Sequence, residues 1–128
     1  MIAMLLDHPA RPSFDLSSLR NIFYGASAIP LDVLRRGLAE FGCGFGQGYG
    51  MTEASSQIAT QGLDSLTQPY QSAPIPLLPI WEARVSADGL LEISGPALFS
   101  GYVAGGKFNP RESAWHTTSD RALLESRS

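Results

Sequence analysis

Hydrophobic and polar positions in the first part of the chain predict a helix, a strand and a second helix. Residues 1–6 are mostly apolar and predict one or two helical turns. Residues 21–24, Asn-Ile-Phe-Tyr, predict a short buried strand that ends at a glycine turn. Residues 30–41 predict a helix, because apolar residues recur there at spacings of three and four and a proline stands at its first turn. Gly42 is expected to end that helix.

Glycine alternates with larger residues in the next segment, which predicts an extended chain over residues 42–50. In that conformation one face carries the side chains and the other is bare backbone, which permits close approach of a ligand or a neighbouring element. A single helical turn is expected over residues 52–55 and a short strand over residues 56–60. The order strand, helix, strand is typical of an α/β unit.

The second part of the chain has a β pattern. Residues 61–79 contain four prolines and predict a loop or linker. Residues 81–86 and 90–94 alternate on either side of an Ala-Asp-Gly turn and predict a β-hairpin. Residues 97–103 predict a further strand, a Gly-Gly pair at 105–106 is expected to open a loop, and residues 121–125 predict the last strand.

These elements predict an α/β fold, with a partial parallel-sheet layer and its helices followed by a small β-rich subregion. The predicted organisation is an α/β portion over residues 1–62, a proline-rich linker over 63–79 and the β-rich subregion over 80–128. The length of 128 residues suits one domain, so both parts are expected to belong to it.

Charge and cysteine content exclude several classes of protein. The formal net charge is −3, from 9 Lys+Arg and 12 Asp+Glu, and the basic residues are spread out, so neither a nucleic acid nor an anionic bilayer is an expected partner. No apolar run reaches the 18 residues or so that a membrane span needs. The single cysteine excludes an internal disulfide, and with two histidines it is too little for a structural zinc site. A reducing, cytoplasmic setting is expected.

Familiar phosphate-binding and hydrolase motifs are absent from the sequence, because neither G-x-x-x-x-G-K-[ST], G-x-G-x-x-G nor G-x-S-x-G occurs. The segment Tyr49-Gly-Met-Thr-Glu53, with Thr118-Ser-Asp120 later in the chain, offers an aromatic ring, hydroxyls and carboxylates. Such groups could stack a base, touch a phosphate and hold Mg²⁺. The alternative, in which Tyr49 packs, Thr52 caps a helical turn and Glu53 favours its N-terminus, stays open. His116 is interpreted as a loop histidine, a place near bound ribose being the alternative.

Four segments in order resemble motifs of the adenylate-forming superfamily, which contains acyl-CoA and aryl-CoA synthetases, luciferases and adenylation domains. The segment Leu19 to Pro30 resembles its strand, glycine turn and helix, and Gln47-Gly-Tyr-Gly-Met-Thr-Glu53 is similar to its Y-G-x-T-E motif. The segment Gly89 to Tyr102 is similar to its G-E-I-x-x-x-G-P-x-x-x-x-G-Y region, and Trp115-His-Thr-Thr-Ser-Asp120 resembles W-x-x-T-G-D, with Ser119 in place of the glycine. Fatty-acyl-CoA ligases and o-succinylbenzoate-CoA ligases give the most similar contexts.

The resemblance implies a site for ATP or AMP with Mg²⁺. Tyr49 would stack on adenine, Asp120 would accept hydrogen bonds from the ribose hydroxyls, Thr52 would bind phosphate, and Glu53 would hold Mg²⁺. Thr52 and Glu53 would thereby be the catalytic residues. The other nucleotide-binding residues would be Gly25, Ala26, Gln47, Gly48 and Gly50.

The function implied is that of an ATP-dependent ligase, which joins a carboxylic acid to AMP and then transfers the acyl group to CoA. A small carboxylic acid and the nucleotide are the implied partners, and the remaining parts of the same enzyme are a further one. The family's phosphate loop and its C-terminal domain with a catalytic lysine have no counterpart here, and Lys107 matches neither lysine of the family. We therefore expect a fragment that is inactive alone. A non-catalytic remnant with weak or no nucleotide binding, acting as a structural or interaction module, and an unrelated α/β binding module are the alternatives.

Overall fold

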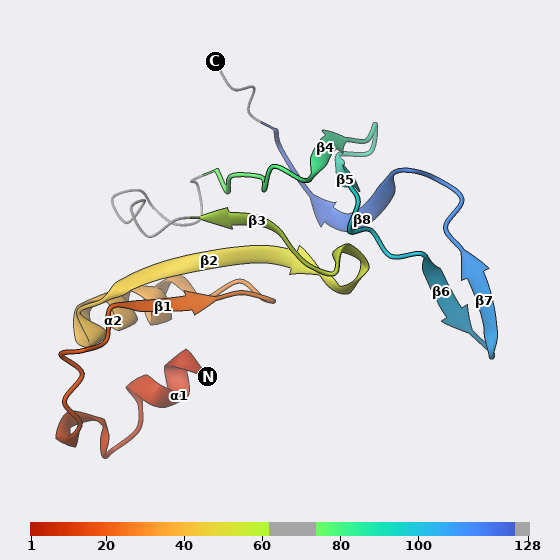
Figure 1. The fold of residues 1–128 in the computed structure, drawn as a ribbon. Coiled ribbons are helices and arrows are strands. Elements are labelled where there is room, and N and C mark those ends of the chain that lie inside the picture. The colour runs from red at the N-terminus through yellow and green to blue at the C-terminus, as the bar shows by residue number, and fades with distance from the viewer. Residues whose placement is uncertain (62–73, 125–128) are drawn as a thin grey trace. The chain divides into compact units, whose positions relative to one another are not determined.

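The computed structural model describes residues 1–61 and 74–124 (Figure 1). The described chain divides into two compact units. The first unit contains residues 1–48 and Gln61, and the second contains residues 49–60 and 74–124. The chain passes from the first unit to the second within strand β2 (Gly44–Met51). The predicted linker over 63–79 lies mostly outside the described residues, and the predicted domain boundaries stay a prediction.

The first unit confirms the predicted order of helix, strand and helix. Helix α1 (Ile2–Leu6) is followed by a single 3₁₀ turn, η1 (Arg11–Ser13), and by strand β1 (Asn21–Tyr24). Helix α2 (Leu31–Phe41) begins one residue after Pro30 and ends at Gly42, as its apolar spacing predicts. β1 pairs in parallel with β2, so that Ile22 lies opposite Phe45.

The core of the first unit is one hydrophobic cluster on the inner side of α2. Its buried members are Leu6, Leu34, Phe41 and Phe45. Because Leu34 and Phe41 are seven residues apart, they share one face of α2 and pack toward β2. Phe45 is 0% exposed, and its ring lies 6.5 Å from those of Tyr24 and Phe41. The alternating segment 42–50 therefore contributes the buried Phe45 to the core. The glycines on either side of Phe45 place no side chain on the strand.

Strand β3 (Ser56–Gln61) completes a three-stranded sheet in the order β1-β2-β3. Between β2 and β3 the chain makes a single 3₁₀ turn, η2 (Thr52–Ala54). Both elements were predicted from the sequence. Further along the chain, Leu77 forms an isolated antiparallel bridge with Ala59 in the second unit.

A second three-stranded sheet lies in the second unit, in the order β4-β5-β8. Strands β4 (Glu82–Val85) and β5 (Leu90–Ser94) form the predicted antiparallel hairpin. The last strand, β8 (His116–Arg121), pairs antiparallel with β5, so the strand predicted over 121–125 is wrong. β8 begins earlier because the consecutive β-branched residues Thr117 and Thr118 favour extended structure.

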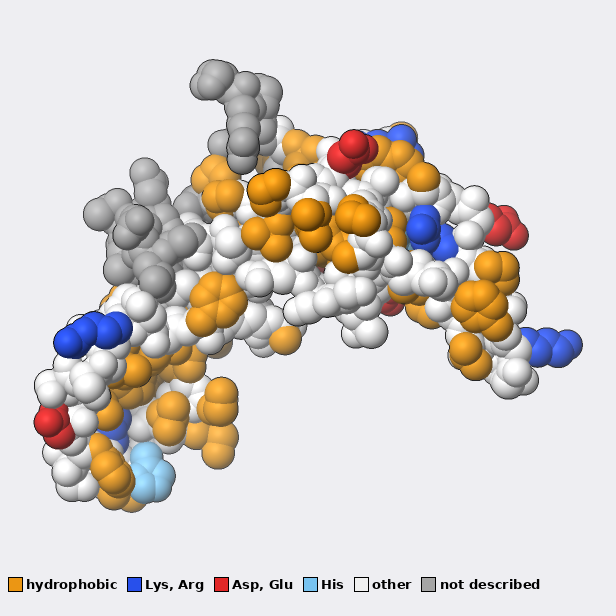
Figure 2. Space-filling model, viewed as in Figure 1, with side chains coloured by type: hydrophobic (Ala, Val, Ile, Leu, Met, Phe, Trp, Pro, Cys, Tyr) orange, Lys and Arg blue, Asp and Glu red, His pale blue; other side chains and the backbone are white. Residues whose placement is uncertain are grey.

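A separate hairpin joins β6 (Gly101–Ala104) and β7 (Lys107–Pro110). The predicted strand over 97–103 is correct only at its end, and β7 was not predicted. The Gly105-Gly106 pair does not open a loop but forms the two-residue turn of the hairpin, with φ of 57° and 74°. Two successive positive φ angles match the twist of antiparallel strands and favour glycine. Hydrophobic side chains lie exposed over this hairpin (Figure 2), at Tyr102, Val103 and Phe108.

The second unit has its own core, built from the β4-β5-β8 sheet, β3 and η2. Its buried members are Ala54, Ile58, Trp81, Leu91 and Ile93. The buried indole N–H of Trp81 donates to the carbonyl of Gln57 at 2.9 Å, which satisfies its polar group. The chain is therefore a mixed α/β structure with few helices and small sheets. Within its described part, no helix is long and apolar enough to cross a membrane.

Candidate functional site

The end of β2 places Tyr49 and Gly50 at the edge of the second core. Tyr49 is half-buried and packs against that core. The backbone of Ser56 approaches Gly50 so closely that a Cβ at position 50 would lie 1.6 Å from the Ser56 carbonyl oxygen. Only glycine fits this contact, because no rotation of a side chain moves its Cβ away. The return of the chain after η2 thus depends on Gly50.

The short turn η2 presents Glu53. Ser55, directly after η2, adopts a left-handed conformation with φ of 52°, and its N–H donates to the carbonyl of Thr52 at 3.1 Å. The carbonyl of Glu53 accepts the N–H of Phe99 at 2.7 Å, and the Ser55 hydroxyl donates to the carbonyl of Ala97 at 2.9 Å. The backbone around Glu53 is therefore fixed by the segment that leads into β6.

Strand β8 presents Asp120. Thr118 is buried, and its Oγ1 accepts the backbone N–H of Asp120 at 3.1 Å. The side chain of Asp120 is exposed at the surface of the strand. Ser119, which stands where the related motif has glycine, is not among the described residues with positive φ. The backbone at this position therefore does not require glycine.

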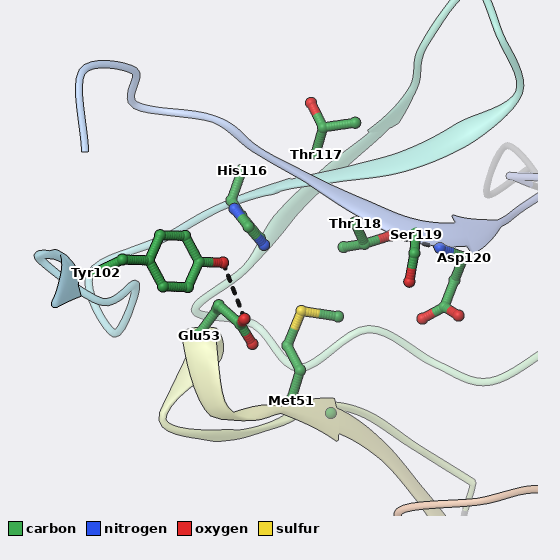
Figure 3. Close-up of a pocket in the computed structure, with 9 residues that line it drawn as sticks. Met51, Glu53, Tyr102, His116, Thr117, Thr118, Ser119 and Asp120 are labelled. Atoms are coloured by element: carbon green, nitrogen blue, oxygen red, sulfur yellow. Dashed lines mark hydrogen bonds between the residues drawn. The ribbon is translucent and has the colours of Figure 1, made fainter. Parts of the chain in front are cut away.

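These segments enclose an open hollow of about 340 Å³ in the second unit (Figure 3). Residues from β2, η2, β6 and β8 line it: Gly50, Met51, Glu53, Tyr102, His116, Thr117, Thr118, Ser119 and Asp120. Tyr49 does not line the hollow, but its hydroxyl donates to Oδ2 of Asp120, a lining residue, at 2.5 Å. Of the residues that the sequence singled out, Glu53, Thr118, Ser119 and Asp120 line the hollow, and Tyr49 lies at its edge.

The contact between Tyr49 and Asp120 joins residues 71 positions apart in the chain. Burial raises the pKa of the Tyr49 phenol above its ordinary value, and the hydrogen bond to the Asp120 carboxylate raises it further. The phenol is therefore neutral at physiological pH and acts as a donor. The hydrogen bond from Tyr49 engages Oδ2 of Asp120. A carboxylate accepts through both of its oxygens and is a suitable acceptor for a diol.

The carboxylate of Glu53 accepts the hydroxyl of Tyr102 at 2.9 Å, the contact drawn as a dashed line in Figure 3. The pKa of Glu53 is lowered, first because its own backbone N–H donates to the carboxylate, then because Tyr102 does so, with a smaller effect from the charge of His116. Figure 3 shows His116 pointing into the same space as Glu53 and Met51. Glu53 is thus ionised at neutral pH.

Glu53 and Asp120 are the acidic residues that line the hollow. The described residues contain no group of three or more His, Cys, Asp or Glu side chains able to hold a metal ion. Mg²⁺ is commonly bound through one or two carboxylates together with water and substrate phosphates rather than by a full set of protein ligands. An ionised Glu53 facing the hollow fits that kind of site, with the phosphates supplied by a nucleotide.

Four of the predicted nucleotide-binding residues lie in the first unit. Gly25 and Ala26 follow β1 and are exposed, and Ala26 has a φ of 68°. Gln47 accepts the hydroxyl of Tyr24 through Oε1 at 3.2 Å, and a Cβ on Gly25 would lie 2.9 Å from the carbonyl oxygen of Gly48. The glycine at position 25 is therefore explained by packing alone. Thr52 lies in the second unit, but it is exposed and does not line the hollow.

Tyr102 was not identified as a site residue from the sequence, and His116 was interpreted mainly as a loop histidine. The signal for Tyr102 was its place in the Gly-Tyr pair that ends the third motif. For His116 it was the position inside Trp115-His-Thr-Thr-Ser-Asp120. Both signals become specific only when the fold brings β6 and β8 to the same hollow.

Comparisons with known proteins identify relatives over most of the chain. The model of the AMP-binding enzyme family matches residues 1–103. The medium/long-chain-fatty-acid–CoA ligase FadD8 of Mycobacterium tuberculosis is 36% identical over 115 residues, which cover 80% of this chain and 20% of that protein. Feruloyl-CoA synthase of an Amycolatopsis species is 31% identical over 112 residues, covering 80% and 22%. The chain spans about a fifth of the length of these relatives.

Solved structures show the same fold. The o-succinylbenzoate CoA synthetase of Bacillus subtilis, in complex with its acyl-adenylate intermediate, matches with a TM-score of 0.67 and 29% identity over 93% of this chain and 26% of that one. The anthranilate CoA ligase AuaEII, in complex with anthranoyl-AMP, matches with a TM-score of 0.76 over 98% of this chain and 26% of that one. Its identity of 18% supports the fold alone.

The family model covers about four fifths of the chain, and it includes the glycine turn after β1, the Tyr49 to Glu53 segment and the motif that ends at Tyr102. FadD8, feruloyl-CoA synthase and the o-succinylbenzoate CoA synthetase are acyl-CoA or aryl-CoA ligases. The resemblance noted from the sequence is confirmed: the chain belongs to the AMP-binding enzyme family and is related to fatty-acyl-CoA and o-succinylbenzoate-CoA ligases.

Proposed function

We propose that the hollow in the second unit is the nucleotide part of an acyl-adenylate-forming site. In this proposal Tyr49 stacks on adenine, the carboxylate of Asp120 accepts the ribose hydroxyls, and Glu53 faces Mg²⁺ and the phosphates. Thr52 binds phosphate, and the backbone of Gly50 allows the nucleotide to approach. Nucleotide binding by Gly25, Ala26, Gln47 and Gly48, which the sequence motifs imply, is a separate proposal for the first unit.

The observation that supports this proposal is that Glu53 from η2 and Asp120 from β8 line one hollow, while Tyr49 of β2 donates to Asp120 at its edge. Each of the two carboxylates is held by a neutral phenol, and the hollow contains no lysine or arginine among its lining residues. Neither hydrogen bond is an ion pair, so both side chains remain available to a cation or a hydroxyl group. A Mg²⁺ nucleotide offers both.

The reaction proposed for the whole enzyme has two steps. A carboxylate oxygen of the substrate attacks the α-phosphorus of ATP, and pyrophosphate leaves to give the acyl-AMP. The thiol of CoA, losing its proton, then attacks the acyl carbonyl carbon, and AMP leaves to give the thioester. Charge develops on phosphate oxygens in the first step, and Mg²⁺ bound at Glu53 would stabilise it. We propose that this chain does not complete the reaction by itself, since it spans about a fifth of its relatives' length.

A non-catalytic remnant is the second candidate, and the Tyr49–Asp120 contact favours it. The hydroxyl of Tyr49 occupies one oxygen of the carboxylate that the ribose would use. In a remnant this hydrogen bond would simply stabilise the second unit. The two candidates differ in the strength of nucleotide binding, which is weak or absent in the remnant.

Isothermal titration of the purified chain with ATP·Mg²⁺, and separately with AMP, tests the proposal. We expect binding of both without formation of acyl-adenylate when a carboxylic acid is added. Asp120→Ala should weaken binding of both by about tenfold or more, because it removes the charged acceptor for the ribose. Asp88→Ala is the matched control, because Asp88 is an exposed acid in the β4–β5 turn, outside the hollow.

Unchanged affinity in Asp120→Ala would contradict the ribose role. Complete absence of nucleotide binding by the unmodified chain would support the remnant. Turnover by the chain alone would contradict the expectation that further parts of the enzyme are required.

A further inference from the structure

We infer that Tyr102 is a positioning residue that holds the Glu53 carboxylate toward the divalent cation accompanying the nucleotide. This inference rests on the proposed function, and it concerns a residue to which neither the sequence motifs nor the family match assigns a role. Tyr102 lies on β6, and its hydroxyl donates to Glu53 Oε1 at 2.9 Å (Figure 3). The two residues are 49 positions apart, so the contact depends on the fold.

Contacts between aromatic rings hold the ring of Tyr102 in place. Its centroid lies 4.6 Å from that of Phe99, and Phe99 in turn meets His116 edge-on at 5.2 Å. Tyr102 is 52% exposed, so burial alone does not fix its side chain. The tilted contact with Phe99, at an interplanar angle of 59°, therefore restricts the phenol to the direction of Glu53. The entropic cost is small because an aromatic side chain has few rotatable bonds.

The same segment holds both ends of Glu53. Phe99 donates its backbone N–H to the Glu53 carbonyl at 2.7 Å, and Tyr102, three residues later, donates its hydroxyl to the carboxylate. The Glu53 carboxylate also accepts its own backbone N–H. The contact with Tyr102 further limits the directions that the three rotatable bonds of the side chain allow. The segment from Phe99 to Tyr102 thus fixes the direction of the carboxylate relative to its own backbone.

A neutral donor is suited to this role. An arginine or lysine would neutralise the carboxylate, whereas a phenol fixes one oxygen and leaves the negative charge in place. A carboxylate can accept about four hydrogen bonds or metal contacts, so the contact with Tyr102 leaves room for a cation. Residues that orient a metal-binding carboxylate in this way change metal affinity by about tenfold when they are removed.

Tyr102→Phe tests the inference, because it removes the hydroxyl and keeps the ring that contacts Phe99. Two quantities are measured on the full chain. The first is the pKa of the Glu53 carboxyl group, followed by carbon NMR without nucleotide and assigned with Glu53→Gln. The second is the ratio of ATP affinities with and without Mg²⁺. Val103→Ala is the matched control, since Val103 is a neighbouring exposed residue of β6 that does not line the hollow.

We expect Tyr102→Phe to raise the pKa of Glu53 and to reduce the Mg²⁺-dependent gain in ATP affinity by about tenfold, with AMP binding in the absence of Mg²⁺ unchanged. Val103→Ala should change none of these quantities. A Tyr102→Phe chain whose Glu53 pKa and Mg²⁺ dependence equal those of the unmodified chain would overturn the inference alone. Failure of the unmodified chain to bind nucleotide, with or without Mg²⁺, would instead overturn the proposed function and the inference together.

Discussion

The first unit and the hollow of the second unit use acidic side chains in different ways. In the first unit, Asp7, directly after α1, and Glu40 of α2 pair with arginines. Arg36 lies 3.0 Å from Asp7 and 3.4 Å from Glu40, and Arg11 also pairs with Glu40. In the hollow of the second unit, Glu53 and Asp120 accept hydrogen bonds from tyrosines instead. Arginine neutralises a carboxylate, whereas a phenol orients it and leaves its charge. This difference separates ion pairs that hold helices together from carboxylates that are available to a ligand.

The largest expected effect comes from truncating a buried side chain in each of the two cores. These truncations test whether the two units unfold independently of each other. Phe45 and Ile93 are each 0% exposed, one in each hydrophobic cluster. Phe45→Ala should lower the free energy of unfolding by about 3–5 kcal/mol and Ile93→Ala by about 2–5 kcal/mol, because each leaves a cavity. Urea unfolding measures these losses of stability, and amide hydrogen exchange shows which elements are destabilised.

Phe45→Ala should speed exchange mainly in α2 and β1, and Ile93→Ala mainly in β5 and β8. Equal acceleration throughout the described chain in both variants would show that the two units unfold as one. In that case the contrast between them would be one of chemistry only. Val103→Ala, at a residue 73% exposed, is the control for truncation without a cavity.

Local patterns were sufficient to predict most of the first unit. The spacing of Leu34 and Phe41 defines the buried face of α2, and Gly42 ends the helix where expected. Both signals act over a few residues, so the sequence carries them directly. The β4–β5 hairpin was predicted for the same reason, because its turn lies between two short alternating runs.

Prediction failed where strand pairing is not local. β8 pairs with β5 across more than twenty residues, and the sequence near Asp120 does not show which segment provides the partner. The β6–β7 hairpin was missed because the Gly105-Gly106 pair suits a loop as well as a tight turn. An exposed hairpin also lacks the clear apolar alternation that identifies a half-buried one.

The candidate site shows the same limit. Tyr49, Glu53 and Asp120 could be singled out because they lie within recognisable motifs. Tyr102 could not be connected with Glu53 without knowledge of how β6 folds back toward η2. Sequence reasoning thus identified the charged groups of the hollow and missed the neutral side chain that orients one of them.

A smaller effect is expected from Glu92, the acid of the second unit that resembles those of the first. Arg84 donates to Glu92 at 2.6 Å and lowers its pKa, and Thr117 lowers it further. Because the folded pKa is below the unfolded one, this contribution to stability is present at neutral pH and is lost as the pH falls through the lowered value. Glu92→Gln should therefore reduce stability at about pH 7 and have less effect below about pH 4.

Urea midpoints of the unmodified chain and of Glu92→Gln, measured across that pH range, test this expectation. The exposed Glu112, for which the structure gives no ion pair within the described residues, provides the control Glu112→Gln. A gap between the Glu92→Gln and unmodified midpoints that is the same at acid and neutral pH would mean that Glu92 contributes through packing rather than charge.

The smallest expected effect concerns the ion pairs of the first unit. Arg36 links α1 to α2, but its side chain is 46% exposed, and pairs of this kind contribute little because water and salt screen them. Arg36→Gln should lower the urea midpoint slightly at low salt, and about 1 M NaCl should remove the difference. Arg35→Gln is the matched control, since Arg35 is the adjacent exposed arginine of α2 and has no ion pair within the described residues. If the urea midpoint of Arg36→Gln stays lower at high salt, the arginine acts by packing between the helices. The contrast between neutralised and available carboxylates would then rest on the second unit alone.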